Sequence, residues 1–260
     1  MRANWAGRQN WPERLWLVRH GQSQGNVARD AADGAGAHEI GIDLRDVDVP
    51  LSALGIDQAK AAGRWFAALP REERPEIILS SPYVRAKQTA EIICSEGALA
   101  GGKAKTLIDE RLREREFGVF DRLTTLGIRE RFPEEAAHRR RLGKFYHRPP
   151  GGESWADVIL RLRSMLNTIN LHYCDRRVLV VCHQVVVLCF RYILEELDEQ
   201  TILDIDRKGE VLNCGIAAYE FEPDAKGRCA PALEVWNYDA PLEAEGAPKT
   251  SAPDAMAGSR

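Results

Sequence analysis

Short apolar runs alternate with longer amphipathic segments along the chain. Three of these runs are rich in β-branched residues and have the length of strands buried on both faces of a sheet: RLWLV (14–18), EIILSS (76–81) and RVLVVCH (177–183). The later runs CGIAAYEFEP (214–223) and ALEVWNY (232–238) predict a hairpin. The pattern therefore predicts a mostly parallel sheet with an antiparallel strand at its edge.

Four segments between these runs space their apolar residues as helices do, and they cover 51–69, 81–97, 153–173 and 185–197. Ser52 and Ser81 are the predicted N-caps of the first two, and Gly97 is the predicted C-cap of the second. Because strands and helices alternate, the chain is predicted to fold as an α/β protein, a three-layer α/β/α sandwich around a doubly wound sheet.

The folded domain is predicted to cover residues 1–238. Residues 239–260 are rich in Ala, Pro and Gly and contain almost no large apolar side chain, so they are predicted to form a disordered tail. Two long irregular segments, 30–50 and 115–152, interrupt the alternation of strands and helices. Loops of that length often serve as lids or substrate loops, so we expect these segments to set the specificity.

Charge and hydropathy exclude some classes of partner. The 260 residues carry a formal net charge of −3, which gives no global attraction to nucleic acid or to an anionic membrane. No apolar stretch approaches the roughly 18 residues that span a bilayer, and the first residues lack the apolar region of a signal peptide. The sequence predicts a cytoplasmic protein whose partners include neither nucleic acid nor a membrane. It leaves the oligomeric state open, with a homodimer among the alternatives.

Cationic side chains follow three of the predicted strands. Arg19 and His20 come directly after the first strand, Arg85 opens the helix after the second, and His183 ends the third. The carboxyl ends of parallel strands meet at one edge of a sheet, where helix N-termini favour anions. Two guanidinium groups at that edge can each hold a pair of oxygen atoms. These residues therefore predict a site for a phosphoryl group.

Neighbouring residues complete the predicted site. Gly21 would let the bound group approach the backbone closely, and Ser23 and Asn26 could donate hydrogen bonds to it. Paired histidines also suit a metal ion, but two arginines beside them would repel a divalent cation. We therefore predict no metal ligand and no cofactor.

A histidine at this edge could accept the phosphoryl group itself, because a neutral imidazole is a nucleophile near pH 7. The leaving alkoxide would then need a proton. Glu114 and Glu116, both within DERLREREFGVF (109–120), supply carboxyl groups just before Gly118, in a loop that could fold over the site. Bound phosphate would raise the pKa of such a carboxyl group, which makes it a candidate proton donor.

The segment LVRHGQSQGN (17–26) resembles the defining motif of the histidine phosphatase superfamily, also called phosphoglycerate-mutase-like. Further matches follow in the order that the family has: PLSALGIDQA (50–59), SSPYVRAKQTA (80–90), RLREREFGVF (111–120), PPGGES (149–154) and VVCHQ (180–184). The resemblance covers roughly residues 14–220 and implies the phosphoglycerate-mutase-like fold.

The resemblance also implies what the residues at the strand ends do. His20 would be phosphorylated during the reaction. Arg19 and Arg85 would bind the phosphoryl oxygens, and His183 would donate a hydrogen bond to the same group.

Other positions that match the motifs would line the pocket. Ser23 and Asn26 belong to this set, as does Gln184, which stands where most members have glycine and where the fructose-2,6-bisphosphatase branch has glutamine. Glu114 matches the family's proton donor. Glu116 is the alternative donor, because only two positions separate the two glutamates.

The departures from the mutase branch favour hydrolysis. That branch continues its glutamate motif as E-R-H-Y-G and has an early G-W-x-D stretch, whereas this chain has EREFG and no G-W-x-D. The resemblance thus implies a phosphatase that acts on a small phosphorylated metabolite. The alternatives are a phosphotransferase of the phosphoglycerate mutase type and a weakly catalytic module that binds phosphorylated ligands.

Some polar residues match no motif. His38, His138, His147 and His172 are predicted to lie on the surface or in loops. The basic segment HRRRLGKFYHR (138–148) is either a solvated helix face or a lid that grips a second anionic group of the substrate.

Overall fold

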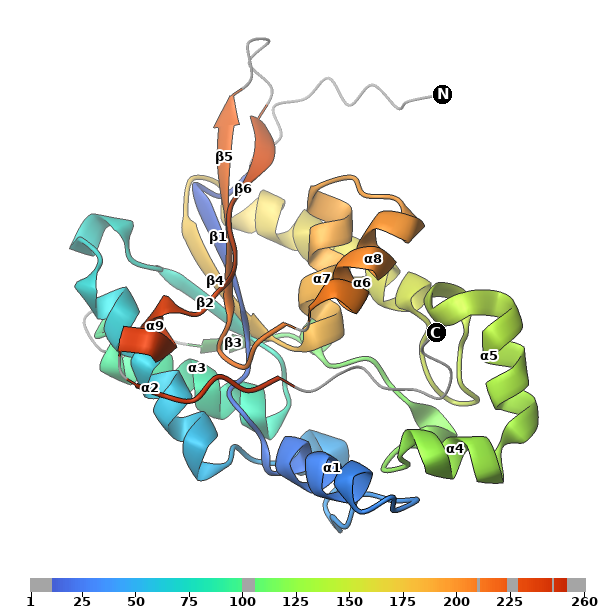
Figure 1. Cartoon of the computed structure of the whole chain (residues 1–260). Coiled ribbons are helices and arrows are strands. Elements are labelled where there is room, and N and C mark those ends of the chain that lie inside the picture. Colours follow the sequence, from blue (N-terminus) through green and yellow to red (C-terminus); the bar gives the residue numbers. More distant parts are fainter. Residues whose placement is uncertain (1–10, 100–105, 210, 224–228, 245, 252–260) are drawn as a thin grey trace, which may run out of the picture.

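Six strands form one mixed sheet at the centre of the molecule (Figure 1). The structure is a computed structural model, and it describes residues 11–99, 106–209, 211–223, 229–244 and 246–251. The strands lie in the order β3-β2-β4-β1-β5-β6; the first four in this order are parallel, and β5 runs antiparallel to both of its neighbours. Their bounds are Arg14–Arg19 (β1), Ile77–Ser80 (β2), Thr106–Ile108 (β3), Arg177–Cys182 (β4), Ile216–Pro223 (β5) and Cys229–Tyr238 (β6).

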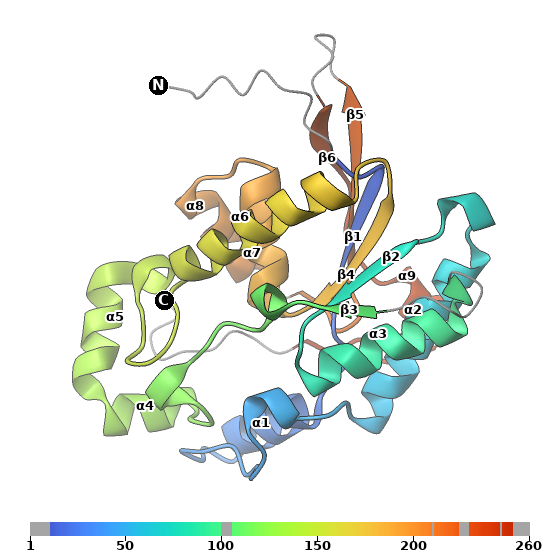
Figure 2. The same ribbon diagram turned by 180° about the vertical axis from the view of Figure 1, so that it is seen from behind.

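Helices cover both faces of this sheet, as the views from the front and from behind agree (Figure 1, Figure 2). One face carries α2 (Ala53–Ala68), α3 (Val84–Glu96) and α9 (Ala240–Ala244). The other carries α6 (Trp155–His172), α7 (Gln184–Leu194) and α8 (Glu199–Lys208). The predicted three-layer α/β/α fold is confirmed. In the described part of the chain, no helix has both the length and the apolar character that crossing a membrane requires.

Apolar side chains that point alternately to the two faces of β1 explain why a helical layer packs against each face of the sheet. Leu15 and Leu17 belong to the apolar cluster formed with α6 and α7, whereas Trp16 and Val18 belong to the cluster formed with α2 and α3. All four side chains are at most 1% exposed. Successive side chains of a strand point to opposite faces, so a run without polar residues is buried on both.

Of the two irregular segments of the sequence, 115–152 folds largely into helices and 30–50 only in part. Residues 30–50 contain the end of α1 (Gln24–Gly34) and the 3₁₀ turn η1 (Asp46–Asp48). Residues 115–152 contain the 3₁₀ turn η5 (Gly118–Phe120), α4 (Thr125–Arg131) and α5 (Pro133–Tyr146). In Figure 1, α1 and α4 lie beyond the lower end of the sheet, where β1 and β4 end.

The predicted helix caps are confirmed in two of three cases. Ser52 accepts a hydrogen bond from the backbone N–H of Gly55 as N-cap of α2, and Gly97 is the C-cap of α3. Ser81 is not the N-cap of α3, because that helix begins at Val84 after Tyr83. The Ser81 hydroxyl instead lies 2.7 Å from the Nε2 of His183, which follows β4.

The prediction of a disordered tail from residue 239 is wrong for the described part of that segment. Residues 240–244 form α9, whose Leu242 is fully buried in the cluster beneath α2 and α3. Thr250 accepts the backbone N–H of Asn213 through its carbonyl oxygen at 2.8 Å and donates its hydroxyl to the Asn213 side chain at 3.0 Å. One well-placed leucine and a few hydrogen bonds thus hold a segment whose composition is typical of disorder. Residues 252–260 lie outside the described residues.

Candidate active site

Three strand-to-helix junctions bring the predicted cations and imidazoles together. Arg19 is the last residue of β1 and His20 follows it, while His183 follows the adjacent strand β4. Arg85 lies in the first turn of α3, directly after β2. All four residues are at most 5% exposed. The rings of His20 and His183 lie 5.0 Å apart, centroid to centroid, and the Nε of Arg85 lies 3.3 Å from the Nε2 of His20.

The His20 ring is held in one tautomer. Its Nδ1 lies 2.7 Å from the carbonyl oxygen of Gly21, which can only accept a hydrogen bond, so Nδ1 carries the proton. Its Nε2 then has a free electron pair, and Arg85 donates to it. Burial lowers the pKa of His20 well below its usual value, and the positive charges of Arg85 and Arg19 lower it further. The ring is therefore neutral, as a nucleophile must be.

Residues of the segment that precedes β5 form hydrogen bonds that hold the chain around His20 in place. Nη1 of Arg19 donates to the carbonyl oxygen of Val211. The Asn213 amide donates to the carbonyl oxygen of His20 at 3.0 Å, and Asn213 is in turn bonded to Thr250. The C-terminal segment thus supports the strand end that carries the candidate nucleophile.

Gly21 serves a purpose other than the predicted one. A Cβ atom at this position would lie 2.4 Å from the carbonyl oxygen of Gly55 at the start of α2, so only glycine allows the two backbones to meet. Its N–H donates to the Thr89 hydroxyl at 3.1 Å. The glycine therefore makes room for α2 and locks the loop after β1, rather than clearing space for a ligand.

Arg85 is engaged by a carboxylate that sequence reasoning missed. Its Nη1 and Nη2 donate to the two carboxylate oxygens of Asp46 at 2.9 and 3.1 Å, and Nη1 also donates to the Asp46 carbonyl oxygen at 2.6 Å. The guanidinium group lies over the Tyr83 ring at 4.8 Å, and Tyr83 also contacts the His183 ring. Asp46 lies in the segment that the sequence predicts to be a lid or substrate loop, but nothing in the pattern marks this residue.

Ser23 and Asn26 lie at the N-terminus of α1 and form a capping box. The Ser23 hydroxyl accepts the backbone N–H of Asn26 at 3.1 Å, and Asn26 Oδ1 accepts the backbone N–H of Ser23 at 2.9 Å. Because Oδ1 is engaged in the cap, the side-chain amide nitrogen of Asn26 is the group that remains to donate to a ligand.

His183 is completely buried; its ring contacts that of His20, but it does not line the cavity beside His20. Its Nε2 is 2.7 Å from the Ser81 hydroxyl, and its buried Nδ1 has no hydrogen-bond partner among the described residues. Burial, Arg85 and His20, in that order, lower its pKa well below the usual value. That His183 donates to a phosphoryl group stays a prediction.

The two candidate proton donors have different surroundings. Glu114 is half-buried, lines the cavity beside His20 and accepts the Arg115 N–H at 2.8 Å. Glu116 is exposed, accepts the Tyr83 hydroxyl at 3.0 Å and is not on the cavity wall. This geometry favours Glu114.

A partly buried network, which the sequence does not reveal, holds the Glu114 loop. Arg161 of α6 donates to the Glu114 carbonyl oxygen at 3.3 Å and to the Glu153 carboxylate at 3.0 and 3.1 Å. Glu153 also accepts the N–H of Glu116 at 3.1 Å. At Gly118, where φ is +56°, a Cβ would lie 2.1 Å from the Pro150 carbonyl oxygen. The EREFG and PPGGES motifs are therefore packed against each other.

The site opens into a cavity of about 110 Å³. Among the predicted site residues its wall contains Arg19, His20, Ser23, Asn26, Arg85, Glu114 and Gln184. The wall contains no residue of the basic segment 138–148, and Lys144 and Arg148 of that segment form ion pairs with Asp206 and Asp157. The segment is therefore not a basic lid over this cavity, and it is a solvated helix face only in part, because Arg139 and Phe145 are buried.

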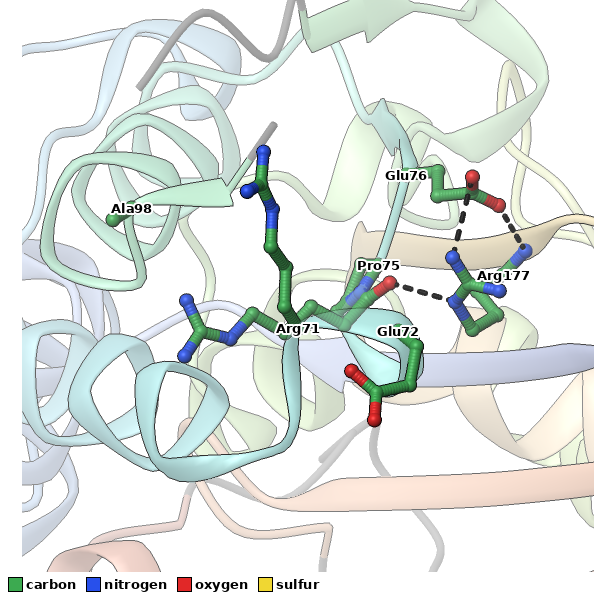
Figure 3. Close-up of a pocket in the computed structure, with 7 residues that line it drawn as sticks. Arg71, Glu72, Pro75, Glu76, Ala98 and Arg177 are labelled. Carbon is green, nitrogen blue, oxygen red and sulfur yellow. Dashed lines mark hydrogen bonds and ion pairs between the residues drawn. The ribbon is translucent and has the colours of Figure 1, made fainter. Parts of the chain in front are cut away.

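A larger cavity of about 770 Å³ lies at the opposite end of the sheet (Figure 3). Its wall includes Glu76, just before β2, and Arg177, at the start of β4, which form an ion pair at 3.2 Å. Ligands of open α/β sheets bind beyond the carboxyl ends of the strands. The cavity beside His20 is therefore the candidate active site, although it is smaller.

One cluster among the described residues has the side chains of a metal site. Ligand atoms of Glu135, His138 and His147 all lie within 4.8 Å of one another. Burial lowers the pKa of His147, and the positive charges of Arg139 and Arg115 act in the same direction. Those charges oppose a cation, so the cluster is a poor metal site. His147 follows the last residue of α5 and so lies in a loop, as predicted, but its side chain is completely buried.

Comparison with known proteins identifies the family. The family model of the histidine phosphatase superfamily (branch 1) matches residues 15–237. The chain belongs to this superfamily. The solved structure of a mycobacterial glucosyl-3-phosphoglycerate phosphatase with inorganic phosphate is similar, with a TM-score of 0.65 at 25% identity over 88% of this chain and 99% of that one.

Curated relatives of this histidine phosphatase superfamily member include more than one activity. The bifunctional protein Rv2228c of Mycobacterium tuberculosis is 35% identical over 179 residues, which are 69% of this chain and 43% of the relative. The chain thus matches less than half the length of that relative. A 2,3-bisphosphoglycerate-dependent phosphoglycerate mutase of Methylorubrum extorquens is 30% identical over 194 residues, which are 74% of this chain and 84% of the mutase. The superfamily assignment therefore covers both phosphatases and mutases.

Proposed function

We propose that this protein is a phosphatase that hydrolyses a small phosphomonoester through a phosphohistidine on His20. Glu114 is the proton donor, and Arg19, Arg85 and His183 stabilise the phosphoryl group. The reaction uses neither a metal ion nor another cofactor. The substrate is a phosphorylated metabolite, and the protein acts in the cytoplasm.

In the first step Nε2 of His20 gives up the hydrogen bond from Nε of Arg85, and its electron pair attacks phosphorus. The bond between phosphorus and the ester oxygen breaks, and the Glu114 carboxyl group gives its proton to the departing alkoxide. Charge on the transferred phosphoryl oxygens is stabilised by the guanidinium groups of Arg19 and Arg85.

In the second step water attacks phosphorus and the bond to Nε2 breaks. The Glu114 carboxylate, left without its proton by the first step, takes one proton from this water. Inorganic phosphate forms, and both His20 and Glu114 return to their starting protonation states. The network of Arg161 and Glu153 keeps the glutamate loop in place through both steps.

The observation that carries the proposal is the tautomer of His20. Nδ1 is bonded to the Gly21 carbonyl oxygen at 2.7 Å, so the electron pair is on Nε2, next to the Arg85 guanidinium group. A histidine that merely bound an anion would serve better when protonated, yet burial and two arginines keep this ring neutral. A neutral ring beside two phosphate-binding cations suits a nucleophile.

The test is phosphate release from a panel of phosphorylated metabolites, with His20→Ala assayed beside the wild type. Phosphate release by the wild type and none above background by the variant is the expected outcome. Equal release by both proteins would refute the phosphohistidine route.

The alternative is a phosphotransferase of the phosphoglycerate mutase type, which the 30% identity to such a mutase favours. Incubation with 3-phosphoglycerate distinguishes the two. A phosphatase that accepts this ester releases inorganic phosphate, whereas a mutase forms 2-phosphoglycerate without releasing phosphate. The sequence EREFG in place of the mutase pattern supports the phosphatase.

The third hypothesis is a weakly catalytic module that binds a phosphorylated ligand. In that case His20→Ala would leave biological activity intact, whereas Arg19→Ala would abolish ligand binding. The neutral state of His20 favours catalysis over this reading.

A further inference from the structure

The Arg85 guanidinium group is occupied by a carboxylate of the protein itself. Asp46 accepts from Nη1 and Nη2 with both carboxylate oxygens, at 2.9 and 3.1 Å. This is the parallel, two-pronged arrangement in which arginine also binds a phosphoryl group. The Asp46 carboxylate therefore uses the pair of donors that a substrate would need.

We propose that Asp46 is an internal ligand of the phosphoryl site, which a phosphoryl group displaces from Arg85 when it binds. The inference rests on the proposed function, because it takes Arg85 as a ligand of the phosphoryl group. Asp46 lies on the wall of the same cavity as His20 and Arg85. Two anions at one guanidinium group in this half-buried cavity would repel each other, so binding is an exchange of one anion for the other.

Arg85 is the member of the pair that stays in place. Its side chain is 6% exposed, whereas that of Asp46 is 42% exposed. Its Nε is bonded to His20, and its carbonyl oxygen accepts the Thr89 hydroxyl at 2.7 Å. The Asp46 carboxylate, in contrast, is already partly hydrated, so its side chain can rotate away from Arg85 toward the solvent.

The segment that carries Asp46 is held at its two ends and exposed between them. The N–H of Ile40 donates to the Arg122 carbonyl oxygen at 2.9 Å, and Val49 is 2% exposed. Residues 43–45 between them are exposed and belong to neither a helix nor a strand. The Asp46 carbonyl oxygen also accepts from Nη1 at 2.6 Å, so freeing Arg85 requires residues 43–48 to move together with the Asp46 side chain, while both ends of the segment stay in place.

The exchange also assists the release of product. Inorganic phosphate is held by the same guanidinium groups as the substrate, and the returning Asp46 carboxylate competes with it for Arg85. The apparent affinity for phosphate equals the intrinsic affinity multiplied by the fraction of molecules in which Asp46 has left Arg85. Asp46 thus sets how tightly this site holds any phosphoryl group.

The test is the dissociation constant for inorganic phosphate, measured by calorimetry on the wild type, Asp46→Asn and Asp48→Asn. An asparagine at position 46 keeps the shape of the side chain without its charge, so Asp46→Asn should bind phosphate about tenfold more tightly. Asp48 is the matched control, since it lies on the same 3₁₀ turn and pairs with the exposed Arg45 at 2.7 Å. Asp48→Asn should bind phosphate as the wild type does.

Weaker or unchanged binding by Asp46→Asn overturns the proposal and makes Asp46 a residue that orients Arg85. Thermal unfolding of each variant checks that it is folded, and Asp46→Ala provides a second variant that lacks the charge. In the wild type, saturating phosphate should speed hydrogen exchange of the amides of residues 43–48. Unchanged or slower exchange there contradicts the displacement.

These measurements need no turnover, so they separate the inference from the proposed function. If no ester is hydrolysed but Asp46→Asn still binds phosphate more tightly, the phosphatase proposal fails and the inference stands. If the wild type is a phosphatase and Asp46→Asn binds phosphate no more tightly, the inference alone fails.

Discussion

The rings of His20 and His183 lie 5.0 Å apart, and both side chains are at most 3% exposed. Burial and the Arg85 guanidinium group lower the pKa of each ring well below the usual histidine value. Two imidazolium ions so close together, beside two arginines, would repel strongly. The folded protein therefore holds both rings neutral at a pH at which free histidine is partly protonated.

This pairing predicts how the stability of the fold depends on pH. As the pH falls below about 6.5, the unfolded chain takes up protons on these histidines and the folded chain does not, so the free energy of unfolding decreases. Each such histidine contributes a slope of up to about 1.4 kcal/mol per pH unit. Urea unfolding between pH 7.5 and pH 5.5 measures this slope. His20→Gln should reduce it, and His172→Ala, which removes an exposed histidine, is the control.

The lowered pKa of His20 also predicts how the rate of phosphoenzyme formation depends on pH in mild acid. The neutral form of His20 is the proposed nucleophile, and its lowered pKa preserves that form in mild acid. The rate of phosphoenzyme formation, measured by rapid quench, should therefore not fall with a midpoint near 6.5 as pH decreases. A midpoint at or above the usual histidine value would mean that His20 is not held neutral by the fold.

Glu114→Gln should slow hydrolysis of an alkyl phosphate by about 10²- to 10³-fold, because an alkoxide leaves only with a proton. An activated aryl phosphate should lose much less, since its leaving group hardly needs one. The ratio of kcat/KM for the two substrates is the measurement. Glu116→Gln is the matched control and should change neither value strongly. A larger selective loss in the Glu116 variant would move the proton donor to that residue.

Leu242→Ala should lower the free energy of unfolding by about 2–3 kcal/mol, because this leucine is fully buried in the apolar cluster formed with α2 and α3. Leu171→Ala removes a leucine that is 75% exposed and serves as the control. Chemical denaturation of both variants checks the prediction. Equal stability of the two would mean that α9 does not pack against the domain in solution.

Vanadate should inhibit competitively with the substrate, because it resembles the five-coordinate phosphorus of the transition state. EDTA should leave the rate unchanged, since the proposed mechanism uses no metal ion. Steady-state rates with each compound provide the check. Loss of activity in EDTA that added metal restores would contradict the mechanism.

The sheet and its main helices could be predicted because their signals are local. The alternating burial of β1 follows from an uninterrupted apolar run, and the Ser52 cap of α2 follows from a serine at the start of a periodic segment. The strand β3 could not be predicted, because it has three residues and two of them are exposed. The position of α9 depends on a single buried leucine that an Ala- and Pro-rich composition conceals.

The residues at the strand ends could be predicted for a different reason. Parallel strands place their carboxyl ends at one edge, so Arg19, His20 and His183 had to meet once the strands were assigned. The contacts of Asp46, Glu153 and Arg161 could not be predicted. They depend on how loops far apart in the sequence fold against one another, and no periodic pattern records that.

The most direct test of the account is to trap the phosphoenzyme. After rapid quenching during turnover of a phosphomonoester, mass spectrometry of the peptides should find one phosphoryl group on His20. It should be labile in acid and stable in base, and it should be absent from His20→Ala. Rapid turnover with no phosphoryl group on His20, or a fully active His20→Ala, would contradict the central claim.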